Sequence, residues 1–212
     1  MLVQDVMTRD VITVSSTTPV AEAQRIMKEN NFRRLPVVDG GKLVGLVTEP
    51  RLEQIKPRTS TPLLWQLTYL ISHTSVGDVM RKKIVTVKPT DTVEQAIGKA
   101  QAAKVGTVIV VDKTKVVGIC TTNDFFYKIV NPTLGIGEGG IRILVPGDDI
   151  GQAARKIVDC VNKLGIKIKV LWGITATSGE HHDIILHLDT EEADKVVPAL
   201  EKVGCTVSLV AR

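Results

Sequence analysis

The segments Asp5-Val-Met-Thr-Arg-Asp-Val-Ile-Thr-Val14 and Asp78-Val-Met-Arg-Lys-Lys-Ile-Val-Thr-Val87 open two copies of one sequence unit. Residues 5–52 align with residues 78–125 at a constant offset of 73, without a gap, and 15 of the 48 paired positions are identical. Most of the other core pairs exchange one aliphatic side chain for another. A repeat of this kind indicates two related structural units, which we expect to form a pseudo-twofold module with two related clefts.

Each copy is expected to fold as a β-α-β-β-α unit, which makes the fold class α+β. An extended segment comes first, at 12–14 or 85–87, and a helix follows. Two apolar strands and a Thr that caps a final helix complete each copy. The second copy shows helical spacing at Val93, Ala96, Ile97 and Ala100. The paired strands are expected at 35–38, 43–47, 108–111 and 116–120.

Several motifs of this repeat resemble a known domain family. They are Asp78-Val-Met, Ile84-Val-Thr-Val, Val110-Val-Asp, Gly118-Ile-Cys-Thr-Thr-Asn-Asp124, Leu35-Pro-Val-Val-Asp39 and Gly45-Leu-Val-Thr48. With them, residues 1–130 resemble a tandem pair of CBS domains, also called a Bateman module. The resemblance implies that the pair binds an adenosine-containing ligand. It divides this part of the chain into repeat one (1–58), a linker helix (59–75) and repeat two (76–130).

Thr121-Thr-Asn-Asp124 is a Thr-x-x-Asp sequence at a helix start. A capping box, in which Thr and Asp side chains satisfy backbone N–H groups, explains this spacing without any ligand. The resemblance instead implies that Asp124 binds the ribose hydroxyls and that Thr121 holds ribose or phosphate, with Val85 and Thr86 along the adenine pocket. An ionised carboxylate offers two acceptor oxygens to a vicinal diol, and a helix N-terminus favours an anion.

The first copy departs from this pattern, because Thr48-Glu-Pro-Arg51 has Arg where the carboxylate should be. Arg cannot accept a hydrogen bond from a ribose hydroxyl. We therefore expect one adenosine site, with Arg51 either disabling the other cleft for nucleosides or reaching a phosphate. Arg33 and Arg34 are either two solvated charges before a strand or, as the resemblance implies, phosphate ligands together with Thr48.

The rest of the chain is expected to form a Gly-rich linker (131–140) and a second domain (141–212). The domain has the order β-α-β-β-α-β, which is ferredoxin-like. With Val145-Pro-Gly-Asp-Asp-Ile-Gly151 it resembles an ACT domain, which implies amino-acid binding near Asp149 and Gly151; a purely structural role in dimerisation explains it as well. The domain order, Trp65-Gln-Leu-Thr-Tyr-Leu70 and Gly137-Glu-Gly-Gly-Ile-Arg142 resemble the AcuB family of acetoin-utilisation proteins.

Composition narrows the function further. The net charge of +4, the scattered basic residues and only 3% aromatic residues argue against a nucleic-acid partner. Three isolated Cys residues, no signal peptide and no long apolar run indicate a cytoplasmic protein that does not enter the membrane. No catalytic constellation emerges. His181, Asp183, His187 and Asp189 share one face of a strand, but neighbours two apart lie about 7 Å from each other, so at most a pair of them could share one metal ion.

The sequence thus predicts a non-catalytic regulatory protein, a homodimer or larger, that senses AMP, ADP or ATP and signals to an unknown regulated protein. S-adenosylmethionine or NAD is the alternative ligand, and a nucleic-acid-binding regulator is the alternative function. We expect no metal.

Overall fold

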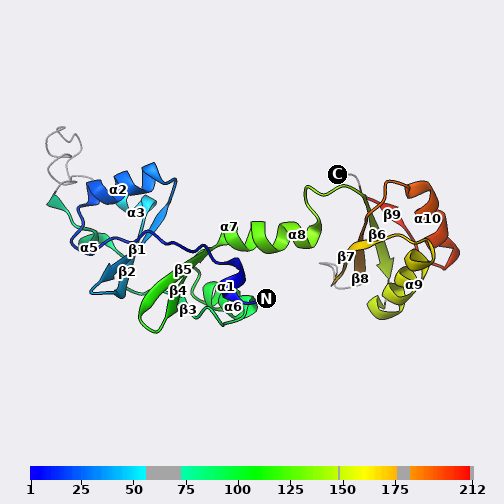
Figure 1. Cartoon of the computed structure of the whole chain (residues 1–212), viewed down its shortest axis with the longest axis horizontal. Coiled ribbons are helices and arrows are strands. Elements are labelled where there is room, and N and C mark those ends of the chain that lie inside the picture. The colour runs from blue at the N-terminus through cyan, green and yellow to red at the C-terminus, as the bar shows by residue number, and fades with distance from the viewer. Residues whose placement is uncertain (56–72, 148, 176–181, 211–212) are drawn as a thin grey trace. The chain divides into compact units, whose positions relative to one another are not determined.

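The computed structural model describes residues 1–55, 73–147, 149–175 and 182–210 of the chain (Figure 1). The chain divides into two compact units, Met1–Phe126 and Tyr127–Arg212. Most of the linker helix expected at 59–75 lies outside the described residues.

The first unit contains the two expected repeats, and the β-α-β-β-α order is confirmed in the second, while the opening strand of the first is reduced to a single bridge. The first repeat consists of α1 (Val3–Val6), α2 (Val20–Glu29), β1 (Arg34–Asp39), β2 (Lys42–Thr48) and α3 (Glu49–Glu53). The second consists of α5 (Val76–Val79), β3 (Thr86–Val87), α6 (Val93–Ala102), β4 (Thr107–Asp112), β5 (Lys115–Thr121) and α7 (Thr122–Phe125).

Each repeat has a small sheet with the same pairing. Strands β1 and β2 are antiparallel, as are β4 and β5, and β3 lies parallel to β4. The strand expected at 12–14 is shorter than predicted, because Val14 forms only a single parallel bridge, to Val37. Buried aliphatic residues on these strands and on the helices form the core of the first repeat: Val14, Val20, Ala23, Met27, Leu35, Val37, Val47, Leu52 and Val76.

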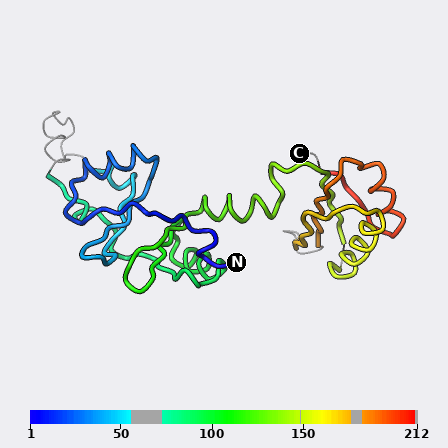
Figure 2. The backbone as a smooth tube through the Cα atoms, viewed as in Figure 1, coloured from blue at the N-terminus to red at the C-terminus, as the bar shows by residue number. Residues whose placement is uncertain are grey.

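The opening segments of the repeats are exchanged. The Thr8 N–H donates to the Ile119 carbonyl at 2.9 Å, and the Ile119 N–H donates back at 3.0 Å. Arg81 and Leu46 form the corresponding pair, at 2.9 and 3.0 Å. Figure 2 shows the blue N-terminal tube passing the second repeat before it enters the first. Each cleft between the repeats is therefore walled by residues of both.

Two glycines make this exchange possible. A Cβ on Gly118 would lie 2.4 Å from Sδ of Met7, and a Cβ on Gly45 would lie 2.1 Å from Sδ of Met80. Both glycines are identical at the 73-residue offset, as are both methionines. The methionine thioether of each opening segment, buried at Met7 and partly buried at Met80, thus packs directly on the backbone of a strand in the other repeat.

We expect Gly118→Ala to destabilise the first unit by about 1–3 kcal/mol, because the added methyl overlaps a buried Met7. Gly98→Ala is the matched control: a Cβ there meets nothing within 4 Å, and Gly98 is exposed inside α6. That change should stabilise the unit by about 0.5–1 kcal/mol through helix propensity. Urea unfolding of both variants checks the opposite signs, and equal stability of Gly118→Ala and wild type would contradict the packing.

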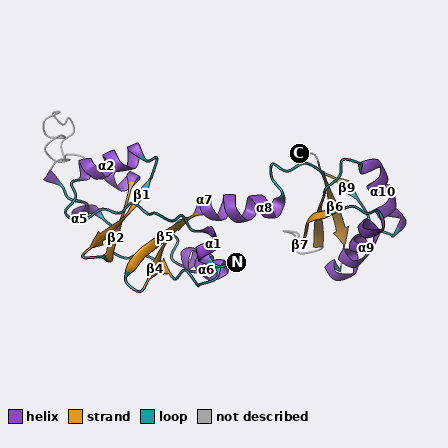
Figure 3. Cartoon of the chain, in the orientation of Figure 1, coloured by secondary structure: helices purple, strands orange, loops and turns teal. Residues whose placement is uncertain are grey.

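The second unit has a four-stranded antiparallel sheet (Figure 3). Its elements are β6 (Ile141–Gly147), α9 (Ile150–Lys163), β7 (Ile168–Thr175), β8 (His182–Leu188), α10 (Ala193–Lys202) and β9 (Ser208–Leu209). The strand order β7-β8-β6-β9 places the first and third strands in the centre, as a ferredoxin-like fold requires. The βαββαβ prediction is therefore confirmed at the level of topology.

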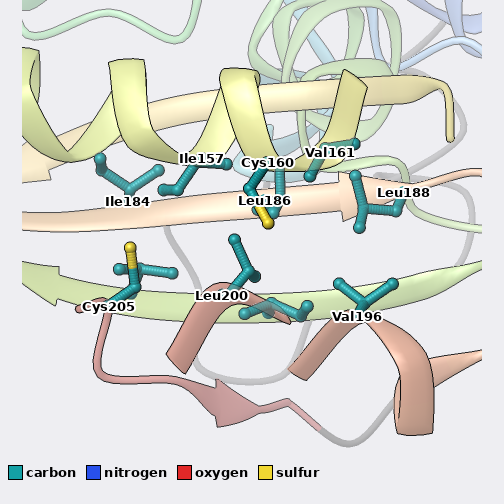
Figure 4. Close-up of a cluster of buried hydrophobic side chains, with 11 residues drawn as sticks. Ile157, Cys160, Val161, Ile184, Leu186, Leu188, Val196, Leu200 and Cys205 are labelled. Carbon is teal, nitrogen blue, oxygen red and sulfur yellow. The ribbon is translucent and has the colours of Figure 1, made fainter. Parts of the chain in front are cut away.

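Alternate residues of β6 and β8 point to one face of this sheet and pack with both helices (Figure 4). Ile184, Leu186 and Leu188 come from β8, while Ile157 of α9 and Leu200 of α10 cover them. All five are at most 1% exposed. Burial of this face is what holds α9 and α10 on the sheet.

The linker expected at 131–140 begins with a helix instead. A π-helical turn (Phe126–Val130) follows α7, and α8 (Asn131–Leu134) continues it until Gly135 adopts a left-handed conformation with φ of 60°. Pro132 lacks an N–H, so a regular helix would lose a hydrogen bond there. The wider π turn lies just before Pro132, and Thr133 Oγ1 donates to the Ile129 carbonyl at 2.6 Å.

Candidate functional site

Two cavities lie between the repeats of the first unit. One, of about 280 Å³, is lined by Thr121 and Asp124, and we name it the Asp124 cavity. The other, of about 290 Å³, is lined by Thr48, and we name it the Thr48 cavity. Most of their lining residues correspond at the 73-residue offset, for example Thr121 to Thr48 and Ile12 to Val85. The predicted pair of related clefts is present.

The Asp124 cavity combines an apolar wall with charged groups. Val11, Ile12 and Ile119 supply apolar surface. Asp10 and Asp124 supply carboxylates, and Arg9, Arg33 and Arg34 supply guanidinium groups. An aliphatic surface next to opposite charges suits a ligand with a flat ring at one end and polar groups at the other.

Asp124 forms the expected capping box with Thr121 at the start of α7. Its Oδ2 accepts from the Thr121 N–H at 2.8 Å and from the Thr121 hydroxyl at 2.7 Å. The Asp124 N–H donates to Thr121 Oγ1 at 3.4 Å. The capping role is thus real, but it leaves the carboxylate at the cavity surface rather than inside the protein.

The second oxygen of Asp124 reaches the other repeat. Its Oδ1 accepts from the Thr8 hydroxyl at 2.9 Å. Thr8 belongs to the exchanged opening segment and also lines the cavity. This carboxylate therefore joins the two repeats at the wall of the cavity.

Arg33 and Arg34 of the first repeat line both cavities. Arg33 Nε donates to Glu49 Oε2 at 2.8 Å, while its side chain is 72% exposed. Within the described part of the chain no ion pair is found for Arg34. Arg33 and Arg34 thus line the same cavity as Asp124, and their binding of phosphate stays a prediction.

The expected positions of Val85 and Thr86 need correction. Val85 lines the Thr48 cavity, and Thr86 pairs with Ile109 in the second repeat's own sheet. Neither residue is among those that line the Asp124 cavity. The physical reason is the exchange of opening segments, which carries Ile12 of the first repeat to the place where Val85 was expected.

Arg51 does not reach the Thr48 cavity, and whether its presence in place of a carboxylate disables that cavity for nucleosides stays a prediction. Its Nε donates to the carbonyl of Val79, the last residue of α5, where a cation meets the negative end of a short helix. Arg51 is absent from the residues that line the Thr48 cavity, although Thr48 and Pro50 line it. The first repeat therefore offers its cavity a hydroxyl without a carboxylate.

Thr8 and Ile12 are site residues that the sequence reasoning missed. The offset alignment contained a signal for Ile12, which pairs with the predicted Val85, but none for Thr8, because its counterpart Arg81 was not a predicted site residue. The alignment could not show that the opening segment of each repeat packs against the other repeat.

A third cavity, of about 290 Å³, lies in the second unit and is lined by Asp149, Lys156 and Cys205 among others. Asp149 caps α9, because its Oδ1 accepts from the N–H groups of Gly151 and Gln152 at 2.8 and 3.1 Å. Burial raises the pKa of the Cys205 thiol, which keeps the thiol protonated. Gly151 does not line this cavity.

The described residues show neither a metal-binding group nor a membrane-spanning helix. They contain no group of three or more His, Cys, Asp or Glu side chains placed to hold a metal ion. They also contain no helix with the length and apolar character needed to span a membrane. His181, one of the strand residues considered for a metal, lies outside the described residues.

Comparison with known proteins assigns the repeats. The family model described as CBS domain matches residues 3–52 and 76–131. Inosine-5′-monophosphate dehydrogenase of Korarchaeum cryptofilum is 34% identical over 133 residues, 62% of this chain and 25% of that protein. Homoserine O-acetyltransferase of Methanohalobium evestigatum is 30% identical over 126 residues, 58% and 23% respectively. The chain thus spans about a quarter of the length of these relatives.

One solved structure is similar along most of its own length. The crystal structure of an acetoin utilization protein (AcuB) from Vibrio cholerae has a TM-score of 0.52 and 29% sequence identity. The match covers 62% of this chain and 91% of that one.

Proposed function

The chain belongs to the CBS domain family, and from this premise we propose that its first unit senses an adenosine-containing ligand bound in the Asp124 cavity. One observation carries the proposal: the Asp124 carboxylate lines the cavity and is held at both oxygens, by Thr121 and by Thr8. A carboxylate fixed in this way can accept hydrogen bonds from the 2′- and 3′-hydroxyls of a ribose.

The remaining walls suit the rest of such a ligand. Val11, Ile12 and Ile119 would contact the adenine ring, and Arg33 and Arg34 would meet phosphate groups. Guanidinium groups bind phosphate oxygens in a planar, two-pronged geometry. We therefore assign AMP, ADP or ATP as the ligand, with S-adenosylmethionine and NAD as alternatives that share the adenosine.

Binding would act on the arrangement of the two repeats. Thr8 belongs to the first repeat and Asp124 to the second, so a ligand that replaces their hydrogen bond changes a contact between repeats. A ligand shifts an equilibrium between arrangements only if it binds one of them better. We propose that the protein is regulatory rather than catalytic and passes this change to a protein partner or to a second copy of itself.

Titration calorimetry of the wild type with AMP, ADP, ATP, NAD and S-adenosylmethionine tests the proposal. We expect at least one to bind, and its 2′,3′-dideoxy analogue to bind about tenfold or more weakly, because the hydrogen bonds to Asp124 are lost. Guanosine and cytidine nucleotides are the controls for base recognition. If no adenosine compound binds, or if the dideoxy analogue binds equally well, the assignment is wrong.

We propose the boundaries 1–130 for the domain pair, 131–140 for the linker and 141–212 for an ACT-like domain.

The ACT-like domain contains a second candidate site. The cavity beside Asp149 supports amino-acid binding, because Lys156 offers it a cation for a carboxylate group. The same titration with free amino acids tests this second function, and its absence leaves dimerisation as the role of the domain.

A further inference from the structure

The Thr48 cavity has an unusual concentration of positive charge. Arg33, Arg34, Arg81, Lys83 and Lys104 line it, and its other lining residues include neither Asp nor Glu. The Asp124 cavity, by contrast, balances three arginines with Asp10 and Asp124. Arg33 already pairs with Glu49, which does not line this cavity, but the like charges of the other cations repel one another, so an anionic ligand would bind here favourably.

A buried hydroxyl provides a second, independent sign of a ligand. Thr107 lines the Thr48 cavity and is only 6% exposed. Its Oγ1 is buried and has no hydrogen-bond partner among the described residues. Buried polar groups normally have a partner, and leaving one without costs free energy that a ligand oxygen would recover.

The cavity lacks the group that would recognise a nucleoside. Its only counterpart to Asp124 is Arg51, which is bound to the Val79 carbonyl and does not line the cavity. The remaining donors are five cationic side chains and the hydroxyls of Thr48 and Thr107. These groups favour a ligand that has many charged oxygens and does not require a hydrogen-bond acceptor from the protein. Linked phosphate groups have these properties.

We propose that the Thr48 cavity is an oligophosphate site that binds two or three linked phosphate groups rather than a second nucleoside. Because Arg33 and Arg34 line both cavities, the phosphates can belong to a free inorganic oligophosphate or to the tail of a nucleotide held in the Asp124 cavity. The second source rests on the proposed function, while the first does not. In either case the first repeat has lost nucleoside binding and kept an anion site.

Arg81 and Lys83 allow a clean test, because they line the Thr48 cavity and not the Asp124 cavity. The double variant Arg81→Gln/Lys83→Gln removes both charges. Lys82→Gln is the matched control, since Lys82 lies between them and lines neither cavity. Calorimetry with inorganic tripolyphosphate, AMP and ATP, without Mg²⁺, separates the two sources.

We expect the double variant to lose about tenfold or more in affinity for tripolyphosphate, for ATP, or for both, while AMP affinity stays unchanged. The Lys82→Gln variant should stay within about twofold of wild type for every probe. If tripolyphosphate binds by itself, the result supports a site for a free inorganic oligophosphate. A preference for ATP over AMP that disappears in the double variant supports the nucleotide tail.

Two results would overturn the proposal: no effect of the double variant on any probe, or an equal effect of Lys82→Gln, which would mean attraction by surface charge alone. Failure of the adenosine assignment looks different. In that case AMP does not bind, while tripolyphosphate still binds and depends on Arg81 and Lys83. Thr107→Val should weaken tripolyphosphate binding without changing the charge, which confirms that the ligand reaches the buried hydroxyl.

Discussion

Replacing Asp124 with alanine is expected to weaken adenosine-ligand binding by about 10- to 150-fold, the equivalent of losing hydrogen bonds to a charged group of about 1.5–3 kcal/mol. The variant should also lose about 0.5–2 kcal/mol of stability, because Asp124 is half of the capping box at α7. Calorimetry gives the first quantity and urea unfolding the second. Both must be measured, since a less stable protein can bind weakly for a trivial reason.

The chain contains a matched control for the capping effect. Asp78 forms the same box with Ser75, accepting from its N–H at 2.9 Å and from its hydroxyl at 2.6 Å. These bonds favour the ionised carboxylate and hold the pKa of Asp78 below its usual value. Asp78 lines neither cavity. Asp78→Ala should therefore lose a similar amount of stability and keep its ligand affinity.

The comparison separates capping from binding at the same kind of motif. If both variants bind adenosine compounds equally well, Asp124 is only a cap, and the site lies elsewhere. If both bind equally poorly, the loss comes from the structure of the unit rather than from the carboxylate in the cavity.

Replacing Leu200 with alanine is expected to destabilise the second unit by about 2–5 kcal/mol, because the change leaves a cavity in a closely packed core. Leu200 is fully buried between α10 and the sheet, next to Leu186 and Cys205 (Figure 4). Leu164→Ala makes the same chemical change at a position that is 40% exposed, and should cost about 0.5 kcal/mol or less.

This variant also tests whether ligand binding depends on the first unit alone. All residues that line the Asp124 cavity belong to Met1–Phe126. Leu200→Ala should therefore keep adenosine-ligand affinity at a temperature where its second unit is still folded. An unfolding midpoint equal to that of the wild type would contradict the close packing of Leu200 in the core. A large loss of ligand affinity would contradict the claim that the site lies wholly in the first unit.

Sequence alone determined the repeat and most of its elements. The alternation and run length of apolar residues fix β1, β2, β4 and β5 to within about two residues, since these patterns are local. The Thr-x-x-Asp spacing likewise predicted the capping box of α7, which depends on four consecutive residues. The βαββαβ order of the second unit followed from the same local patterns and from few possible topologies.

Tertiary structure decided which residues meet at the site. The 73-residue offset makes Ile12 equivalent to Val85 and Arg51 equivalent to Asp124, but equivalence does not say which copy faces which. The exchange of opening segments puts Thr8 and Ile12 beside Asp124, and leaves Val85 beside Thr48. Contacts between segments more than 100 residues apart depend on packing such as that of Met7 on Gly118, which local patterns do not encode.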